Sequence, residues 1–310
     1  MESTEIGKNA EQLKDALQRI LQQAQTNIDT DTFKQEKKID SFIIKPSTDN
    51  KTLKTLIAIK TGTFLDSMFL DDNEKSIDGI PFGSSIIVAG IPNTGKSLLC
   101  AELALRLANN GNKVAFITSE EVWRTETARL DLESRMKGKA SLLGLNWQTI
   151  ASNLFILDCV SNAELRQFEN LVSSYKTLVE DKGVTITVTD SLSLLEDQRG
   201  QIKSRLLEFV RYGQVKGVTS LFISQRATDD VDGFSLAGGL GLSHIVDIMA
   251  VMDSKKLSSW DKSIKEDTGK AQGDSINFFH ILKNRICKYK ANYFGYSITK
   301  DGIVSLDQKP

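Results

Sequence analysis

The stretch SIIVAGIPNTGKSLL, residues 85–99, decides the fold. Its first five residues form a largely apolar run typical of a strand buried on both faces, and the leucines that follow predict an amphipathic helix over residues 97–110. Between them, residues 90–97 match the pattern G-x-x-x-x-G-K-[ST] at every fixed position. In such a loop the backbone amides point inward, and the helix N-terminus adds the positive end of its dipole. The stretch therefore predicts a phosphate-binding loop between a strand and a helix.

The chemistry of this loop predicts a site for ATP and Mg²⁺. We expect the Lys96 ammonium to reach the β- and γ-phosphates and the Ser97 hydroxyl to ligate Mg²⁺. The other residues expected to bind the nucleotide are Gly90, Ile91, Pro92, Asn93, Thr94, Gly95 and Leu98.

Further polar residues stand where other apolar runs end, which is where ligands bind in open α/β sheets. Asp190 closes the run 184–190, and we expect it to act on the metal side of the site. Glu120 and Glu121 follow the run 114–118. We expect Glu120 to be the base that activates water, with Glu121 tuning it or contacting a neighbour; the alternative is an acidic, solvated helix start. Gln225 ends the run 221–225 and is either a γ-phosphate sensor or a plain polar strand end.

The order of the apolar runs predicts an α/β fold. Runs at 85–89, 114–118, 154–159, 184–190 and 221–225 alternate with helices expected over 97–110, 124–137, 163–179 and 201–215. This alternation predicts a mostly parallel central sheet flanked by helices. After about residue 245 the runs 245–252, 276–285, 293–298 and 303–306 follow one another without helices, which predicts antiparallel C-terminal strands.

The N-terminal region differs from the rest. Residues 1–50 are expected to form a helical arm and linker, and residues 51–310 the main domain. One apolar stripe runs along residues 9–27, formed by Leu13, Leu17, Ile20, Leu21 and Ala24. We expect this helix to dock on its own or a neighbouring subunit, and the alternative is recruitment of another protein.

Composition narrows the class of protein. The 310 residues carry 39 Lys and Arg against 40 Asp and Glu, a net charge of −1, so no global basic field attracts nucleic acid or anionic lipid. Three cysteines without a CxxC pair argue against a zinc site. Because the chain has neither an apolar signal core nor a run of about 18 apolar residues, we expect a cytoplasmic protein without a membrane span.

Several further motifs resemble those of one family. They are TGTFLD at 61–66 with DGIPFGS at 78–84, SEE at 119–121, VTDSL at 188–192, GGLGLSHIVD at 238–247 and KNR at 283–285. In this order they resemble the RecA-like P-loop ATPases, and among them the branch of KaiC and bacterial RadA. The resemblance covers roughly residues 56–306.

The resemblance implies a homo-oligomer, expected as a hexameric ring, with ATP at the subunit interfaces. Lys283 and Arg285 would then be basic residues that reach the γ-phosphate held by the neighbouring subunit. Two residues apart on an expected strand, they would share one face, and the alternative is a pair of solvated side chains. Arg129 falls where relatives carry an arginine near the adenine.

Two functions follow. The first is an oligomeric ATPase whose nucleotide state controls assembly or partner binding. The alternative is a DNA-dependent ATPase of recombination, repair or strand handling. Residues 226–234 carry three acids and one base, whereas a loop that tracks single strands is basic and aromatic, and Ile286-Cys287 stands where bacterial RadA has Phe-Gly. Nucleic acid is therefore the less favoured partner.

Overall fold

The computed structural model describes residues 56–126, 131–195, 202–225, 242, 244–259, 270–299 and 302–305. The chain divides into two units, residues 1–54 and 55–310, and the first lies outside the described residues. The helical arm therefore stays an expectation. Within the described part of the chain, none of the helices has the length and apolarity needed to cross a bilayer.

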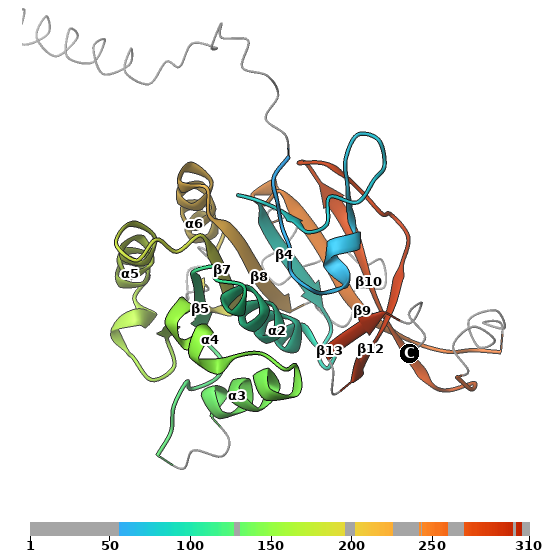
Figure 1. The fold of residues 1–310 in the computed structure, drawn as a ribbon, viewed down its shortest axis with the longest axis horizontal. Helices are drawn as coiled ribbons and strands as arrows, with labels where there is room; N and C mark the ends of the chain where they lie inside the picture. The colour runs from blue at the N-terminus through green and yellow to red at the C-terminus, as the bar shows by residue number, and fades with distance from the viewer. Residues whose placement is uncertain are drawn as a thin grey trace, which may run out of the picture. The chain divides into compact units, whose positions relative to one another are not determined.

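The described residues are built around one large sheet (Figure 1). Its strands are β4 (Ser85–Gly90), β5 (Val114–Thr118), β6 (Leu154–Asp158), β7 (Ile186–Asp190), β8 (Thr219–Gln225), β9 (Ile248–Lys256), β10 (Ser275–Asn284), β12 (Phe294–Thr299) and β13 (Gly302–Ser305). Their order is β13-β12-β10-β9-β4-β8-β7-β5-β6. Neighbours from β9 to β6 are parallel, while β10, β12 and β13 are antiparallel to their neighbours. This confirms the predicted α/β fold with antiparallel C-terminal strands.

Two short strand pairs lie outside this sheet. They are β1 (Ala58–Ile59) with β3 (Ile80–Pro81), and β2 (Phe69–Leu70) with β11 (Lys288–Tyr289). The helices of the described residues are α2 (Lys96–Asn109), α3 (Leu132–Leu142), α4 (Trp147–Asn153), α5 (Phe168–Glu180) and α6 (Ile202–Lys216), with short 3-10 turns η1 (Phe64–Ser67), η2 (Glu164–Arg166) and η3 (Leu192–Leu195).

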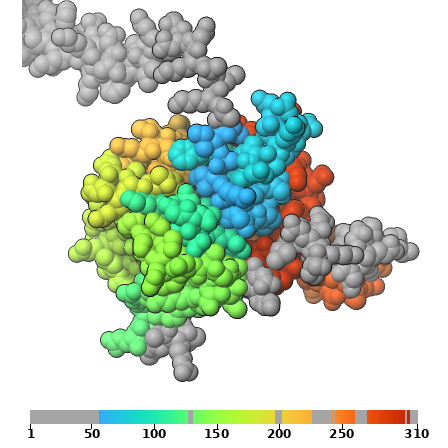
Figure 2. All heavy atoms as spheres, viewed as in Figure 1, coloured from blue at the N-terminus to red at the C-terminus, as the bar shows by residue number. Residues whose placement is uncertain are grey.

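Alternating strand residues feed two cores, one on each face of the sheet. Val88 and Phe116 are buried with Leu103 and Met136 beneath α2, α3 and α4. Their strand neighbours, among them Ile87, point the other way and pack beneath α5 and α6. Figure 2 shows α3 and α4 (green) covering the near face beside residues 56–95 (blue). Apolar strands covered on both faces explain why a parallel sheet forms here.

The structure departs from the sequence prediction at three points. The helix expected over 124–137 begins later, at Leu132, because Asp131 accepts a hydrogen bond from the Ser134 amide (2.8 Å) and caps it. Asn146 caps α4, a helix that the sequence analysis did not anticipate, by accepting from the Gln148 amide (2.9 Å). The run after residue 245 was expected to begin the antiparallel strands, but β9 is parallel to β4, and the reversal comes only at β10.

Candidate active site

The 90–97 loop follows β4 and leads into α2, as the sequence predicts. A Cβ on Gly90 would lie 2.0 Å from the carbonyl oxygen of Met252 on β9, so this position excludes any side chain. Gly95, with φ of 88°, adopts the left-handed conformation at the start of α2, and a Cβ there would lie 2.8 Å from Ile298 Cδ1. Gly90 is thus required by the close approach of the β9 backbone, and Gly95 by its left-handed conformation.

Internal hydrogen bonds hold the loop in shape. The Thr94 hydroxyl and the Lys96 ammonium both donate to the carbonyl of Ile91, at 2.9 Å and 2.7 Å. The hydroxyl of Tyr296 on β12 donates to the carbonyl of Thr94. The C-terminal strands therefore support the loop directly, and the loop keeps its curvature through its own side chains.

Lys96 lies among three carboxylates. Burial lowers the pKa of its ammonium, while Asp190, Glu120 and Asp253 act to raise it. A buried cation surrounded by acids is suited to moving onto an anionic ligand, since a phosphate then replaces the backbone carbonyl as its partner. Sequence analysis did not identify Asp253, which lies on β9 beside the loop; no sequence motif marks it.

Asp190 ends β7 and is buried. Burial raises the pKa of its carboxyl most strongly, and the Ser97 hydroxyl opposes this by hydrogen bonding to it. Its Oδ1 atom is buried without a hydrogen-bond partner among the described residues. A hydroxyl beside a carboxylate with an unsatisfied oxygen fits Mg²⁺, which prefers oxygen ligands and takes most of the others from water and phosphate. Accordingly, the absence of a group of three or more His, Cys, Asp or Glu in the described chain does not conflict with this site.

A cavity of about 310 Å³ opens at the 90–97 loop. Its opposite wall is formed by Glu120, Asp190 and Gln225, which come from the ends of three parallel strands or the residues just after them. Gln225 lies directly opposite Gly90 in the register of β4 and β8. The strand topology thus brings together Lys96, Ser97, Asp190, Glu120 and Gln225, five residues that the sequence analysis singled out.

Glu120 accepts a hydrogen bond from a group of three linked serines. The buried Ser191 donates its hydroxyl hydrogen bond to Glu120, with 2.6 Å between the oxygens. Ser191 and Ser193 hydroxyls are 2.7 Å apart, and the Ser191 amide donates to Ser119 Oγ at 3.0 Å. The Ser191 hydroxyl thus orients one carboxylate oxygen of Glu120, and Ser119 and Ser193 hold Ser191 in place.

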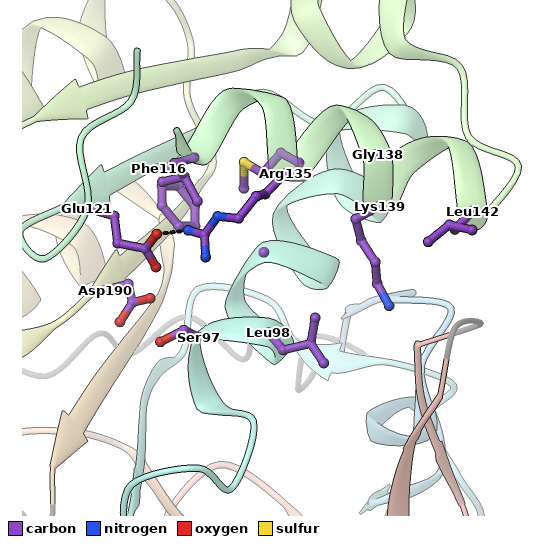
Figure 3. A pocket seen from close by; sticks show the side chains of 12 residues that line it. Ser97, Leu98, Phe116, Glu121, Arg135, Gly138, Lys139, Leu142 and Asp190 are labelled. Carbon is purple, nitrogen blue, oxygen red and sulfur yellow. Dashed lines mark ion pairs between the residues drawn. The ribbon is translucent and has the colours of Figure 1, made fainter. Parts of the chain in front are cut away.

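Glu121 takes a different direction from Glu120. It lines a second cavity, of about 440 Å³, which adjoins the first through Ser97, Leu98 and Asp190. There it forms an ion pair with Arg135 of α3, drawn as the dashed line in Figure 3. The rest of this cavity is mainly apolar, and its α3 wall consists of Leu132, Arg135, Met136, Gly138, Lys139 and Leu142.

Arg135 and Lys139 were not identified from the sequence. Their spacing of four, together with buried Leu132 and Met136, would have placed them on the inner face of a helix that begins at residue 132. Because the sequence analysis expected the helix over residues 124–137, it did not identify that face. Arg129, expected near the adenine, lies outside the described residues.

Lys283 and Arg285 lie far from the loop of their own subunit. Lys283 is opposite Met249 on β9, near the edge at which the parallel strands begin, and Gly90 is opposite Met252. β10 ends at Asn284, so Arg285 follows the strand rather than continuing it. Lys283 donates to the carbonyl of Val246 (2.8 Å) and Arg285 to that of His244 (3.0 Å), so both side chains bond to the segment before β9, although Arg285 does not share a strand face with Lys283.

Comparisons with known proteins agree on one group. The family model described as "ATPase: KaiC" matches residues 59–309. The DNA repair protein RadA of Campylobacter jejuni is 25% identical over 184 residues, which are 58% of this chain and 36% of that protein. The archaeal flagellar ATP-binding protein FlaH of Sulfolobus acidocaldarius is 26% identical over 131 residues, 40% of this chain and 53% of FlaH. The chain thus spans little more than a third of this RadA and about half of FlaH.

Among solved structures, the KaiC-like protein PH0186 of Pyrococcus horikoshii OT3 has a TM-score of 0.60 and 18% identity. The match covers 81% of this chain and 99% of that one. At this identity the likeness concerns the fold, and it places the described sheet and helices among the RecA-like folds.

Proposed function

Since the chain belongs to the KaiC family of ATPases, within the KaiC and RadA branch of RecA-like P-loop ATPases, we propose that it binds ATP with Mg²⁺ and hydrolyses it in a homo-oligomer. Its nucleotide state would control assembly or the binding of a partner. The observation that carries the proposal is the first cavity, where the 90–97 loop faces Glu120, Asp190 and Gln225.

Each residue has a role that its surroundings support. Lys96 would leave the Ile91 carbonyl for the β- and γ-phosphates. Ser97 and Asp190 would hold Mg²⁺, which when bound neutralises charge on the phosphate oxygens. Glu120, oriented by Ser191, would take a proton from the attacking water, and Gln225 would contact the γ-phosphate. Glu121 lines the second cavity, and this proposal gives it no role at the phosphates.

The second cavity offers a place for the adenosine half. It adjoins the loop at Ser97 and Leu98, where the chain leaves the phosphates, and Leu98, Met136 and Leu142 give it apolar walls. A flat nucleotide base packs well against apolar walls, and a cavity of this size falls within the range of small-molecule sites.

Lys283 and Arg285 would act on the neighbouring subunit. Within their own subunit they lie toward the opposite edge of the sheet from the loop, which supports action in trans. Turnover would then depend on assembly, because the charge that stabilises the transition state comes from another chain.

The test is the rate of phosphate release measured with Mg²⁺ over a wide range of protein concentrations, with Lys96→Ala as control. We expect specific activity to rise with concentration and Lys96→Ala to be inactive. A parent rate no higher than that of Lys96→Ala would refute ATP hydrolysis. A concentration-independent rate from a monomer would refute the shared site.

A DNA-dependent ATPase is the second candidate, and the similarity to DNA repair proteins named RadA favours it. The acidic residues 226–234 argue against it from sequence, and they lie outside the described residues. Adding single-stranded DNA to the same assay separates the two. A many-fold stimulation would make the DNA-dependent function the leading one, and no stimulation would leave the assembly switch.

A further inference from the structure

Arg135 joins α3 to the acids of the site. It is the fourth residue of α3, at the end of the first turn, and forms an ion pair with Glu121 across the second cavity (Figure 3). The same guanidinium lines this cavity together with Asp190 and acts to lower the pKa of that carboxyl, while burial, the largest influence, raises it. Glu121, Asp190 and the Ser97 hydroxyl thus line the same cavity as this arginine.

The position of Arg135 is fixed by the start of its helix. The Leu132 amide donates to the carbonyl of Val122 (3.1 Å), and the Glu133 amide donates to that of Trp123 (3.0 Å). The segment that carries Glu121 is therefore bonded through its backbone to the first turn of α3. An arginine one turn into that helix reaches Glu121 without any rearrangement of the chain.

We propose that Arg135, paired with Glu121 and lining the same cavity as Asp190, is the protein's own counter-cation at this edge of the site in the metal-free protein, and that it gives way to Mg²⁺ when the metal and nucleotide bind. This inference rests on the proposed function. The arginine and the metal ion would compete for the same carboxylate charge. Either cation alone balances that charge, whereas two cations held close together repel each other. Arg135 would then be a positioning residue that sets how much Mg²⁺ the site requires.

Two opposite effects follow from the competition. Without Mg²⁺, the acids repel a triphosphate, and Arg135 reduces this repulsion. Removing its charge should therefore weaken metal-free nucleotide binding while strengthening the binding of Mg²⁺. For a half-exposed pair near a protein surface we expect each change to be about five-fold. A merely structural role of Arg135 would weaken both.

The experiment titrates Mg²⁺ into the full chain with a fluorescent, non-hydrolysable ATP analogue, and repeats nucleotide binding in EDTA. Arg135→Gln is the test variant and Arg135→Lys the conservative one. Lys137→Gln is the matched control, since Lys137 lies two residues away, is similarly exposed (48% against 51%) and pairs instead with Glu133. Both Gln variants change the net charge equally.

We expect Arg135→Gln to need about five-fold less Mg²⁺ for half-saturation and to bind the analogue about five-fold more weakly in EDTA. Arg135→Lys and Lys137→Gln should stay near the parent. If the magnesium midpoints of Arg135→Gln and Lys137→Gln coincide while the parent binds nucleotide, this inference alone is overturned. If the parent binds no nucleotide under either condition, the proposed function fails and this inference with it.

Discussion

The hydroxyl of Ser191 and the carboxylate of Glu120 are hydrogen bonded, with 2.6 Å between Oγ and Oε1. Ser191 directly follows Asp190, so one strand end carries the acid expected to hold the metal and also orients the acid expected to activate water. This relationship links β7 to the residues after β5, which are neighbours in the sheet. The orientation of the Glu120 carboxylate therefore depends on Ser191, a residue to which we assign no contact with the substrate.

Ser191→Ala should reduce turnover while leaving nucleotide binding intact. The variant removes a hydrogen bond to a charged group, which contributes about 1.5–3 kcal/mol, so we expect kcat to fall by about ten-fold or more. Steady-state kinetics beside an equilibrium binding assay measure the two effects separately. Ser152→Ala is the control, because the Ser152 hydroxyl donates to a backbone carbonyl on the exposed side of α4. Equal turnover by both variants would show that Ser191 does not orient Glu120.

Asp190→Asn should stabilise the metal-free protein at neutral pH. Because burial raises the pKa of Asp190 in the folded state, keeping the group ionised costs free energy of folding above that pKa. Below the unfolded value of 3.8 the carboxyl is neutral in both states and the cost disappears. Thermal melts in EDTA from pH 8 to pH 4 should thus show a gain of a few degrees at pH 7 that shrinks as the pH falls. An Asn variant that melts below the parent at pH 7 would contradict this account.

Much of this arrangement can be predicted from local sequence. The 90–97 loop can be predicted because each fixed residue of its motif is needed either for the backbone conformation or for binding phosphate. Asp190, Glu120 and Gln225 can be predicted because each stands at the end of an apolar run or just after it. The ends of parallel strands meet at one edge, so the pattern alone brings these residues together. Membership in the family then supports the same reading.

The remaining features depend on contacts between distant segments. Arg135 was missed because the start of α3 is fixed by the Asp131 cap and by backbone bonds to residues 122 and 123, none of which leaves a periodic signal. The parallel direction of β9 was missed because an apolar run reads the same in either direction. Asp253 lies near the site only because its strand, β9, pairs with β4, which leads into the 90–97 loop.

Gly302→Ala should destabilise the protein and weaken the support of the 90–97 loop. Gly302 has φ of 110°, and a Cβ there would lie 2.4 Å from Oε1 of the buried Glu102. That carboxylate accepts a hydrogen bond from the Ile303 amide (3.1 Å), which holds β13 to α2. We expect a loss of about 2 kcal/mol or more in the free energy of unfolding, measured by denaturant titration.

Gly138→Ala is the matched control for this prediction. Gly138 lies within α3, has ordinary φ, and its added Cβ would meet no atom within 4 Å. Alanine is the better helix former, so this variant should be neutral or slightly stabilising. If Gly302→Ala were as stable as Gly138→Ala, β13 would not be held as the structure has it.

The variants Lys96→Ala and Lys283→Ala should each be inactive alone, but a mixed assembly of the two variant subunits should be active. Lys283 lies roughly 10 Å along the strands and two strands across from Gly90, and its ammonium is bonded to Val246 on the side away from the loop. A subunit therefore does not supply this lysine to its own loop. Lys283→Ala should still bind nucleotide, because its loop is intact, whereas Lys96→Ala should not.

Co-assembled, the two variants can form an interface with an intact loop from one and an intact Lys283 from the other. With random mixing about a quarter of the interfaces are of this kind, so we expect up to about a quarter of the parent activity. The measurement is phosphate release by co-expressed, co-purified subunits at a concentration where the parent is assembled. Recovery requires that Lys283 act between subunits, since neither chain carries a complete set. A co-assembled mixture no more active than Lys96→Ala alone would rule out action in trans and return Lys283 to the role of a structural lysine that holds the segment before β9.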